Sequence, residues 1–445
     1  MAKQAQEVTH PRQALPDETW SLTETVMAVR EGRRSPAEEL ARSLTRIDEV
    51  DFDVRAWHWL FTEEARDRAR DLSNVQRADT LGALAGVPVG LKATIDVTGY
   101  PTYRWNGPGG HPVADRDAWI VRRLRQLDAQ LVGKTTSSGF VRSFIPGTRN
   151  PHNLAHTPGG SSNGSAAAVA AGMVPLAIGT HTAGSVTAPA AYCGIAGYVA
   201  PAGSLPMSGV VRPCPTLDSL GFFAPTVADL AVAEAALLGR GDVHPTRDWR
   251  QAPPRVARWV DYAWGEVADD VQQAMESATA QLAERGAQIT DFSLGTLADD
   301  LKHALEVVMG YEGRRELAAD IDEAQLEESQ LCGYLRTESE SSWHDYRQAL
   351  ATMAGGYDWV RQMFSDYDVI IAPAIARRAP LGERNIDYPV LSVPWQALGL
   401  PVVTFPLDDD RAPGDLPIGI QLIGSASAVP ELFALARDME AVLRP

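Results

Sequence analysis

Two glycine-rich turns that carry serines flank an alanine-rich run between residues 157 and 199. The stretch reads TPGGSSNGSAAAVAAGMVPLAIGTHTAGSVTAPAAYCGIAGYV, and Ser161 and Ser185 lie on its two turns. Glycine is common where the backbone takes a positive φ or passes close to another group. Two such turns so close together predict a site assembled from main-chain N–H groups as well as side chains. Such a site suits an anion or a developing oxyanion.

Strand-like and helix-like segments alternate around this stretch. An apolar, β-branched run at 84–99 is bounded by glycine and proline, as expected of a buried strand. Such alternation is typical of a largely parallel sheet covered by helices. Two helices are predicted within about 20–50, with capping residues Ser21 and Ser35 at their starts. Further helices are predicted at 63–74, 117–129, 165–172, 226–238 and 430–443, and further strands at 129–133, 174–179, 368–374, 400–406 and 416–424, with a strand-like break near 287–292 in a helical region at 267–365.

Apolar runs that predict strands occur again near the C-terminus. One sheet that contains strands from both ends of the chain explains this pattern more simply than two domains do. We therefore expect a single domain over residues 1–445 with an α/β fold. Its expected parts are a helical segment at 20–75, a core at 84–240, a mainly helical cover at 255–365 and C-terminal core strands with a helix at 366–445.

Composition limits the classes of partner. The net charge is −17 and no run of Lys and Arg occurs, which argues against nucleic-acid or anionic-membrane binding, since both need clustered cations. The three cysteines show no metal-ligand spacing and no disulfide framework. The longest apolar run, 166–179, is too short to span a bilayer. We expect a cytoplasmic protein without a metal.

Lys92 lies within the apolar run at 84–99. Lysine is rarely buried without a reason, so this residue is a candidate for chemistry. The alternative is a lysine on an edge strand that reaches solvent.

The GSSNG segment at 160–164 matches the GxSxG pattern, which would make Ser162 the nucleophile of an α/β-hydrolase. That pattern needs a strand running directly into the serine, whereas the preceding AHTPG predicts a turn. A phosphate-binding loop is also disfavoured because no Gly-Lys-Ser/Thr follows the glycines. Two tight turns without chemical consequence remain the plain alternative.

Several segments, in this order, resemble the signature of the amidase signature family. They are GVPVGLK (86–92), TRNPHN (148–153), TPGGSSNGSAAAVAAG (157–172), THTAGSVTAPAAYCGIAG (180–197) and TLDSLG (216–221), followed by the C-terminal APA and LPIGIQLIG segments. The resemblance implies a single α/β/α domain around a large mixed, mostly parallel sheet. It also implies amide hydrolysis by a Ser-cisSer-Lys triad without a cofactor, and it suggests a homodimer.

Carried over by position, the resemblance makes Ser185 the nucleophile, Ser161 the bridging serine on a cis peptide and Lys92 the base. Ser162 becomes a hydrogen-bonding partner behind the relay, and His181 is expected to be structural, with a catalytic role as the alternative. The implied oxyanion hole consists of the backbone N–H groups of Thr182, Ala183, Gly184 and Ser185.

This chain departs from the family pattern at the proposed site. The aspartates that usually follow the lysine and open the nucleophile turn are Ala93 and His181, and Ala183 replaces a glycine. The arginine that often follows the nucleophile, and binds a substrate carboxylate in some members, is missing. We therefore expect a small neutral amide, held by aromatic residues, with core packing as the alternative for these residues: Tyr103, Trp105, Phe140 and Trp395.

The expected function is hydrolysis of a small neutral carboxamide to a carboxylate and ammonia or an amine, through an acyl-serine. A second hypothesis is an amidotransferase subunit or an enzyme that passes the acyl group to an amine. A third, motivated by the departures, is a non-catalytic binding or scaffold protein.

Overall fold

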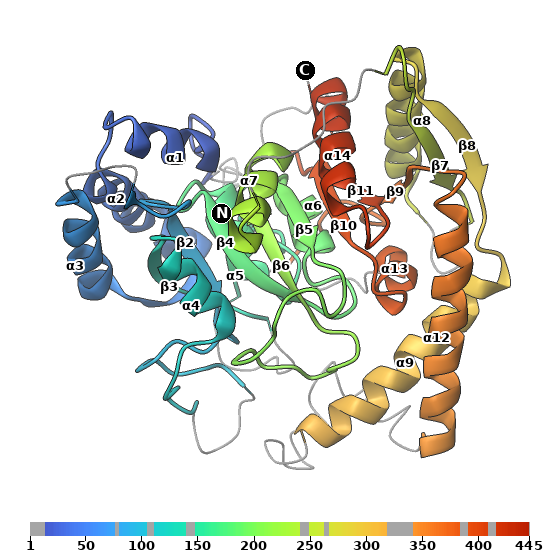
Figure 1. The fold of residues 1–445 in the computed structure, drawn as a ribbon, viewed down its shortest axis with the longest axis horizontal. Coiled ribbons are helices and arrows are strands. Elements are labelled where there is room, and N and C mark those ends of the chain that lie inside the picture. Colours follow the sequence, from blue (N-terminus) through green and yellow to red (C-terminus); the bar gives the residue numbers. More distant parts are fainter. Residues whose placement is uncertain are drawn as a thin grey trace, which may run out of the picture.

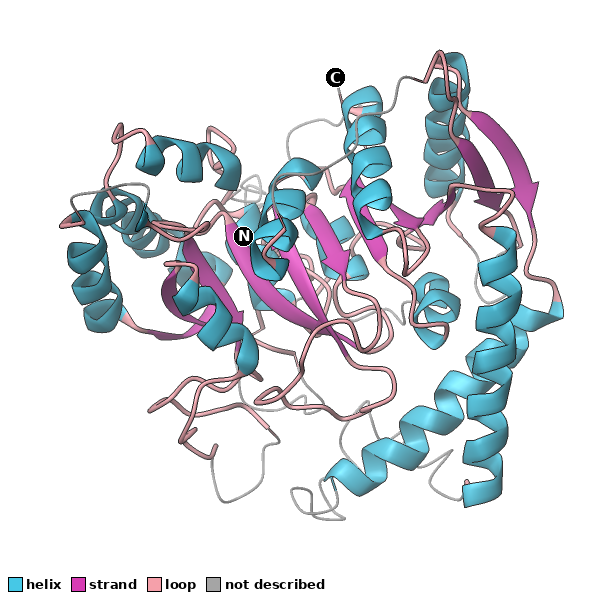
Figure 2. Cartoon of the chain, viewed as in Figure 1, coloured by secondary structure: helices cyan, strands magenta, loops and turns pink. Residues whose placement is uncertain are grey.

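The computed structural model describes residues 14–75, 80–104, 111–138, 147–240, 249–261, 267–317, 341–382, 390–407 and 415–444. Its elements form helices packed on both faces of a twisted sheet (Figures 1 and 2). The strands are β1 (Trp57–Leu60), β2 (Pro88–Lys92), β3 (Gln130–Thr135), β4 (Leu176–His181), β5 (Ala196–Val199), β6 (Ser219–Ala224), β7 (Arg255–Trp259), β8 (Gln288–Phe292), β9 (Val369–Pro373), β10 (Val402–Pro406) and β11 (Gly419–Ile423).

Helices account for most of the other described elements. They are α1 (Leu22–Arg30), α2 (Pro36–Val54), α3 (Thr62–Ser73), α4 (Trp119–Gln126), α5 (Asn163–Ala170), α6 (Thr187–Cys193), α7 (Val227–Leu238), α8 (Asp269–Glu284), α9 (Thr296–Leu317), α12 (Trp343–Met363), α13 (Val393–Ala397) and α14 (Val429–Leu443), with a 3₁₀ turn η2 (Val390–Ser392). No described helix combines the length and apolar character needed to cross a membrane.

The N-terminal helices begin where the sequence predicts. The Ser35 hydroxyl accepts the Glu38 N–H, and the Glu38 side chain reciprocally accepts the Ser35 N–H at 2.7 Å, which satisfies two backbone donors at the start of α2. Ser21 accepts the Glu24 N–H in the same way at the start of α1.

The eleven described strands lie in one sheet in the order β1-β3-β2-β4-β6-β5-β10-β11-β9-β7-β8. Strands from both ends of the chain are therefore neighbours, and the prediction of an α/β fold with one large mixed sheet is confirmed. The shared sheet supports the single-domain prediction, which stays a prediction.

The expectation that the sheet is mostly parallel is wrong in detail. Four neighbouring pairs are parallel, namely β2–β3, β2–β4, β7–β8 and β7–β9, while the other six, which include all the central pairs from β4 to β9, are antiparallel. Residues 200–218 join β5 to β6 without a helix, and parallel neighbours need a crossover connection. The alternation of helix and strand in the sequence does not reveal that the chain turns back here to form an antiparallel pair.

The two faces of the central sheet are covered by different helices. Helices α5 and α6 pack on one face, and α7 and α14 pack on the other (Figure 1). A Cβ at Gly197 of β5 would meet Ala190 of α6, whereas the next residue, Tyr198, packs on Phe433 of α14. Successive side chains in a strand point to opposite faces, so these contacts fix which face each helix covers.

The strands β1, β5, β6 and β7 are not predicted from the sequence. The expected helical cover includes residues 255–259, but this segment pairs with β8 and β9 at the far end of the sheet. Beyond it, α9 and α12 pack against each other along one side of the molecule (Figure 2).

Candidate active site

Lys92 is the last residue of β2, between β3 and β4 in the middle of a buried sheet. Its side chain is 2% exposed, and its Nζ donates hydrogen bonds of 2.8 Å to Ser161 Oγ and of 2.8 Å to Thr180 Oγ1. The alternative of a lysine on an edge strand is therefore wrong. The Lys92 side chain instead contacts Ser161, one of the two serines that the sequence analysis selects.

Burial lowers the pKa of Lys92 from its ordinary value of 10.5 to about 7, while the carboxylate of Asp218 acts in the opposite direction. An ammonium group has three N–H donors, and within the described residues only two of them find acceptors, both neutral hydroxyls. Removal from water disfavours the charged amine. A substantial fraction of Lys92 is therefore a neutral amine near pH 7, and a neutral amine can accept a proton.

Ser161 lies between Lys92 and Ser185. The peptide bond from Gly160 to Ser161 is cis, and the Ser161 hydroxyl donates to Ser185 Oγ at 3.1 Å. The Ser161 carbonyl is held by the backbone N–H of Ser138 at 3.2 Å and by the hydroxyl of Ser137 at 3.2 Å. The predicted triad residues thus form a continuous hydrogen-bonded chain from the amine to the outer serine.

Ser185 follows a tight turn between the end of β4 and the start of α6. Gly184 in this turn has φ of +139°, a conformation that favours glycine. In the part of the chain that the structure describes, the backbone N–H groups of Ala183, Gly184 and Ser185 donate to no protein acceptor. Unpaired N–H groups beside a nucleophile are what an oxyanion hole requires, so that assignment stays a prediction with suitable geometry.

His181 and Ser162 brace the two turns. His181 is 1% exposed, and its Nδ1 accepts the Val186 N–H at 3.1 Å, which ties the residue after the nucleophile to the end of β4. Burial, and to a smaller extent the charge of Lys92, lowers the pKa of His181 to about 3, so the ring is neutral. The Ser162 hydroxyl donates to the Thr180 carbonyl at 3.1 Å rather than facing Ser185. This geometry favours structural roles for both residues.

Asp218 and Thr180 are site residues that sequence reasoning does not select. Asp218 is 4% exposed; its carboxylate accepts from the Thr182 hydroxyl at 2.5 Å and from the Cys214 N–H at 2.8 Å. Burial raises its pKa to about 7 despite these hydrogen bonds. Asp218 lies in the TLDSLG segment, which the sequence analysis recognises as a motif. The signal that could have selected it is a carboxylate in an otherwise largely apolar segment. Thr180 could be found from its place in β4, one residue before the end of that strand.

The predicted substrate-binding aromatics are not brought together. Tyr103 is 4% exposed, and its N–H donates to the Ala93 carbonyl at 2.9 Å, next to Lys92. Trp395 is completely buried in α13 and packs edge-on against Trp259, with ring centroids 5.2 Å apart. Trp395 therefore matches the alternative of core packing. Two predicted positions, Trp105 and Phe140, lie outside the described residues.

The described residues contain no cluster of three or more His, Cys, Asp or Glu side chains arranged to hold a metal ion. The described site contributes a lysine, two serines and backbone N–H groups.

Comparison with known proteins places this geometry in a family. A family model described as Amidase matches residues 38–431. A glutamyl-tRNA(Gln) amidotransferase subunit of Halothermothrix orenii is 28% identical over 459 residues, which cover 92% of this chain and 94% of that protein. The protein of the same name from Exiguobacterium sibiricum is 29% identical, with 93% and 95% of the two chains covered.

Solved structures share the fold. A protein described in connection with a vestigial complex and the origins of an s-triazine catabolic enzyme has a TM-score of 0.80 and 26% identity, covering 95% of this chain and 98% of its own. A bacterial aryl acylamidase of the amidase signature family has a TM-score of 0.77 over 95% of this chain and 96% of its own, and at 24% identity it shows the fold alone. Because the family model spans most of the sequence, this chain belongs to the amidase signature family, whose members act on C–N bonds.

Proposed function

We propose that this chain cleaves the C–N bond of a small neutral amide through an acyl-enzyme on Ser185. The observation that carries the proposal is the hydrogen-bonded chain from Lys92 Nζ to Ser161 Oγ, 2.8 Å long, and from Ser161 Oγ to Ser185 Oγ, 3.1 Å long. Its inner end is a buried amine whose pKa is lowered to about 7. A weak nucleophile needs such a base within hydrogen-bonding reach.

Proton transfer reverses the direction of both hydrogen bonds. With charged Lys92, the amine donates to Ser161 and Ser161 donates to Ser185. Once the amine is neutral, both hydroxyls rotate, so that Ser185 donates to Ser161 and Ser161 donates to Lys92. The Ser185 oxygen then attacks the amide carbonyl while its proton moves to Ser161 and the Ser161 proton moves to Lys92. Collapse of the tetrahedral intermediate returns a proton through the same chain to the leaving nitrogen.

The unpaired N–H groups of the nucleophile turn are suited to the negative oxygen of that intermediate. Losing one donor of an oxyanion hole costs about a hundredfold or more in rate. His181 and Asp218 hold the turn from its two ends, through Val186 and Thr182 respectively. These tethers preorganise the donors before the substrate arrives.

A neutral substrate fits the residues after the nucleophile. Val186, Thr187 and Ala188 are all buried, and none carries a positive charge. A substrate carboxylate would gain no bidentate partner from them. Water is the proposed acceptor of the acyl group, which gives a carboxylate and ammonia or an amine.

The second candidate function is an amidotransferase subunit that liberates ammonia for transfer. The names of the relatives that cover most of this chain favour it. The two candidates share acyl-Ser185 and differ in substrate and in dependence on a partner. Ammonia release by the purified chain from a neutral carboxamide such as benzamide, with glutamine as the comparison, separates them. Release only from glutamine, or only with a partner, supports the second candidate.

Covalent labelling tests the chemistry common to both candidates. A fluorophosphonate should add one mass label at Ser185, which is lost in Ser185→Ala and strongly slowed in Ser161→Ala and Lys92→Met. Two matched variants serve as controls. Ser162→Ala removes the neighbouring serine, whose hydroxyl bonds to Thr180, and Lys134→Met removes a second buried lysine, which bonds to Pro101 and Thr102. Both should be labelled. No labelling of the wild type at any pH supports a non-catalytic protein.

A further inference from the structure

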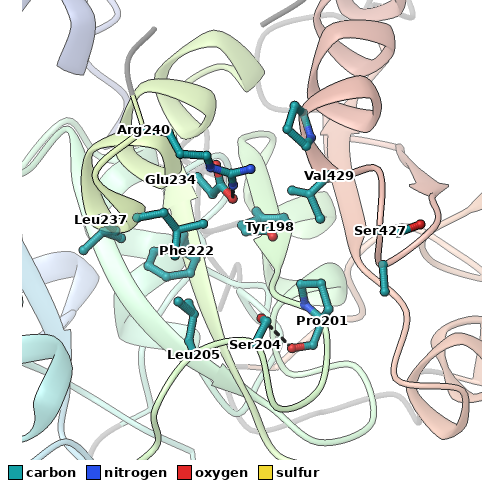
Figure 3. A pocket seen from close by; sticks show the side chains of 13 residues that line it. Tyr198, Pro201, Ser204, Leu205, Phe222, Glu234, Leu237, Arg240, Ser427 and Val429 are labelled. Carbon is teal, nitrogen blue, oxygen red and sulfur yellow. Dashed lines mark hydrogen bonds and ion pairs between the residues drawn. The ribbon is translucent and has the colours of Figure 1, made fainter. Parts of the chain in front are cut away.

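We propose that the molecule has a second small-molecule site on the face of the sheet opposite the catalytic serines. The site would take a neutral, ring-sized compound that carries one hydrogen-bond donor. It is a cavity of about 200 Å³ between α7 and the start of α14, above β5 and β6 (Figure 3).

The sheet separates this cavity from the active site. Tyr198 and Phe222 line the cavity, and their strand neighbours Gly197 and Gly221 face the other way. A Cβ on either glycine would meet the side chain of Val186, the residue after the proposed nucleophile. The cavity is therefore not an extension of the catalytic cleft, and a ligand in it would contact a different set of residues.

The walls of the cavity are largely apolar. Phe222 and Tyr198 stack with ring centroids 5.8 Å apart, and Leu205, Leu237 and Val429 add further apolar side chains to the lining. An apolar cavity of about 150 Å³ in another protein holds benzene. A cavity of about 200 Å³ accommodates one ring with a small substituent.

One end of the cavity offers two polar groups without a partner. Tyr198 is 2% exposed, and its hydroxyl makes no hydrogen bond to any described residue. Glu234 is 4% exposed; one of its oxygens accepts from Arg240, as the dashed line in Figure 3 shows, while the other has no partner among the described residues. Both residues line the cavity, so a ligand that enters it can form hydrogen bonds with them.

The chemistry of these groups defines the ligand. A carboxylate only accepts hydrogen bonds, so the ligand must donate one. Arg240 already balances the charge of Glu234, which leaves no unbalanced charge for an ionic ligand. Arg240 and Ser427 lie at the protein surface, so the cavity can be reached from solvent. A phenol or an aryl alcohol has the required shape and donor.

Phenol and its methyl ether, anisole, form a matched pair of probes, measured by calorimetric titration of the full chain. Phenol should bind saturably, and anisole at least about tenfold more weakly, because anisole cannot donate a hydrogen bond to Glu234. Glu234→Leu, which removes the acceptor, should bring the two affinities closer together. Leu205→Trp fills the cavity and should abolish binding. Ser185→Ala should bind phenol like the wild type, which separates this site from the active site.

A crystal soaked in 4-bromophenol locates the ligand independently of any variant. A bromine peak between α7 and α14 supports the proposal, even if Leu205→Trp does not fold. Absence of saturable phenol binding overturns it. So does equal binding of phenol and anisole, unchanged binding in a folded Leu205→Trp variant, or a bromine peak only beside Ser185.

Discussion

Asp218 and Thr182 are joined by a hydrogen bond of 2.5 Å from the threonine hydroxyl to the buried carboxylate. Thr182 opens the turn that carries Ser185, and the second oxygen of Asp218 is held by the Cys214 N–H. The same carboxylate raises the pKa of Lys92. One side chain thus anchors the turn that carries the proposed nucleophile and also influences the proposed base, although the two aspartates usual in this family are absent from this chain.

Asp218→Asn should lower the pH at which activity rises. In the proposed mechanism Lys92 must be neutral to accept a proton, so the acidic limb of the kcat/KM profile should lie near the lysine pKa of about 7. Removing the carboxylate removes the group that raises this pKa, so the limb should move to lower pH. The maximal rate should fall as well, because an amide cannot accept both hydrogen bonds.

The control for this variant is Asp291→Asn, which removes a carboxylate of β8 that is paired with Arg258 of β7. The acidic limb of its kcat/KM profile should coincide with that of the wild type. A limb that stays in place in Asp218→Asn would exclude Asp218 from control of the base.

His181→Asp and His181→Asn separate the charge of this position from its hydrogen bond. The side-chain oxygen of either variant can accept the Val186 N–H, which His181 Nδ1 accepts in the wild type. The aspartate adds a negative charge near Lys92, which should raise the lysine pKa and move the acidic limb to higher pH, by about one unit or more. The asparagine should leave the limb in place. Equal profiles for the two variants would show that His181 does not set the electrostatics of Lys92.

The ordered motifs select Lys92, Ser161 and Ser185, and the structure joins these three residues by hydrogen bonds; their catalytic roles stay a prediction. Prediction fails where an assignment depends on contacts between distant segments. Trp395 is one of the predicted substrate-binding aromatics, yet it is buried and packs against Trp259, 136 positions earlier in the sequence. Asp218 shows the same limit, since only tertiary packing reveals that it faces the nucleophile turn.

Prediction of the fold is also reliable only for features that local sequence determines. Local patterns predict α2 and most core strands, because capping residues and apolar runs act within a few residues. Strand direction is not encoded locally: the antiparallel pairing of β5 with β6 depends on a connection without a helix over residues 200–218. The charged strand β7 escapes prediction because its sequence, RVARW, lacks a continuous apolar run.

Lys92→Met should be more stable than the wild type, and the difference should depend on pH. Lysine has a pKa of about 10.4 in the unfolded chain and about 7 in the folded protein. Between these values the unfolded state binds a proton that the folded state does not, so the wild type gains stability as pH rises. The advantage of the variant should therefore be largest at and below pH 7, on the order of 5 kcal/mol, and should shrink towards pH 10.

Urea unfolding at pH 6, 8 and 9.5 measures this difference. Lys302→Met is the control, because Lys302 lies on α9 beside Glu306 and keeps contact with solvent. Its difference from the wild type should stay nearly constant over this range. A constant difference for Lys92→Met would mean that the folded protein keeps Lys92 charged.

Gly221→Ala should impair catalysis through Val186. A Cβ at Gly221 would lie 2.2 Å from Val186 Cγ2, and a Cβ at Gly197 would lie 3.3 Å from the other methyl group. Val186 is a stiff β-branched residue, its N–H is tied to His181, and it directly follows the proposed nucleophile. Moving it displaces Ser185 from Ser161. We expect a loss of about 1 to 3 kcal/mol in stability and a drop in kcat of about tenfold or more.

Two further variants make this test specific. Gly355→Ala adds the same methyl group within α12, where no atom lies within 4 Å of the new Cβ, and it should add roughly 0.5 to 1 kcal/mol of stability without changing kcat. In the double variant Gly221→Ala with Val186→Ala, the clash is relieved, so kcat should recover relative to Gly221→Ala alone. Recovery beyond the sum of the single effects is the coupling expected of residues in contact. Simple additivity would show that Gly221 acts on catalysis by a route that does not pass through Val186.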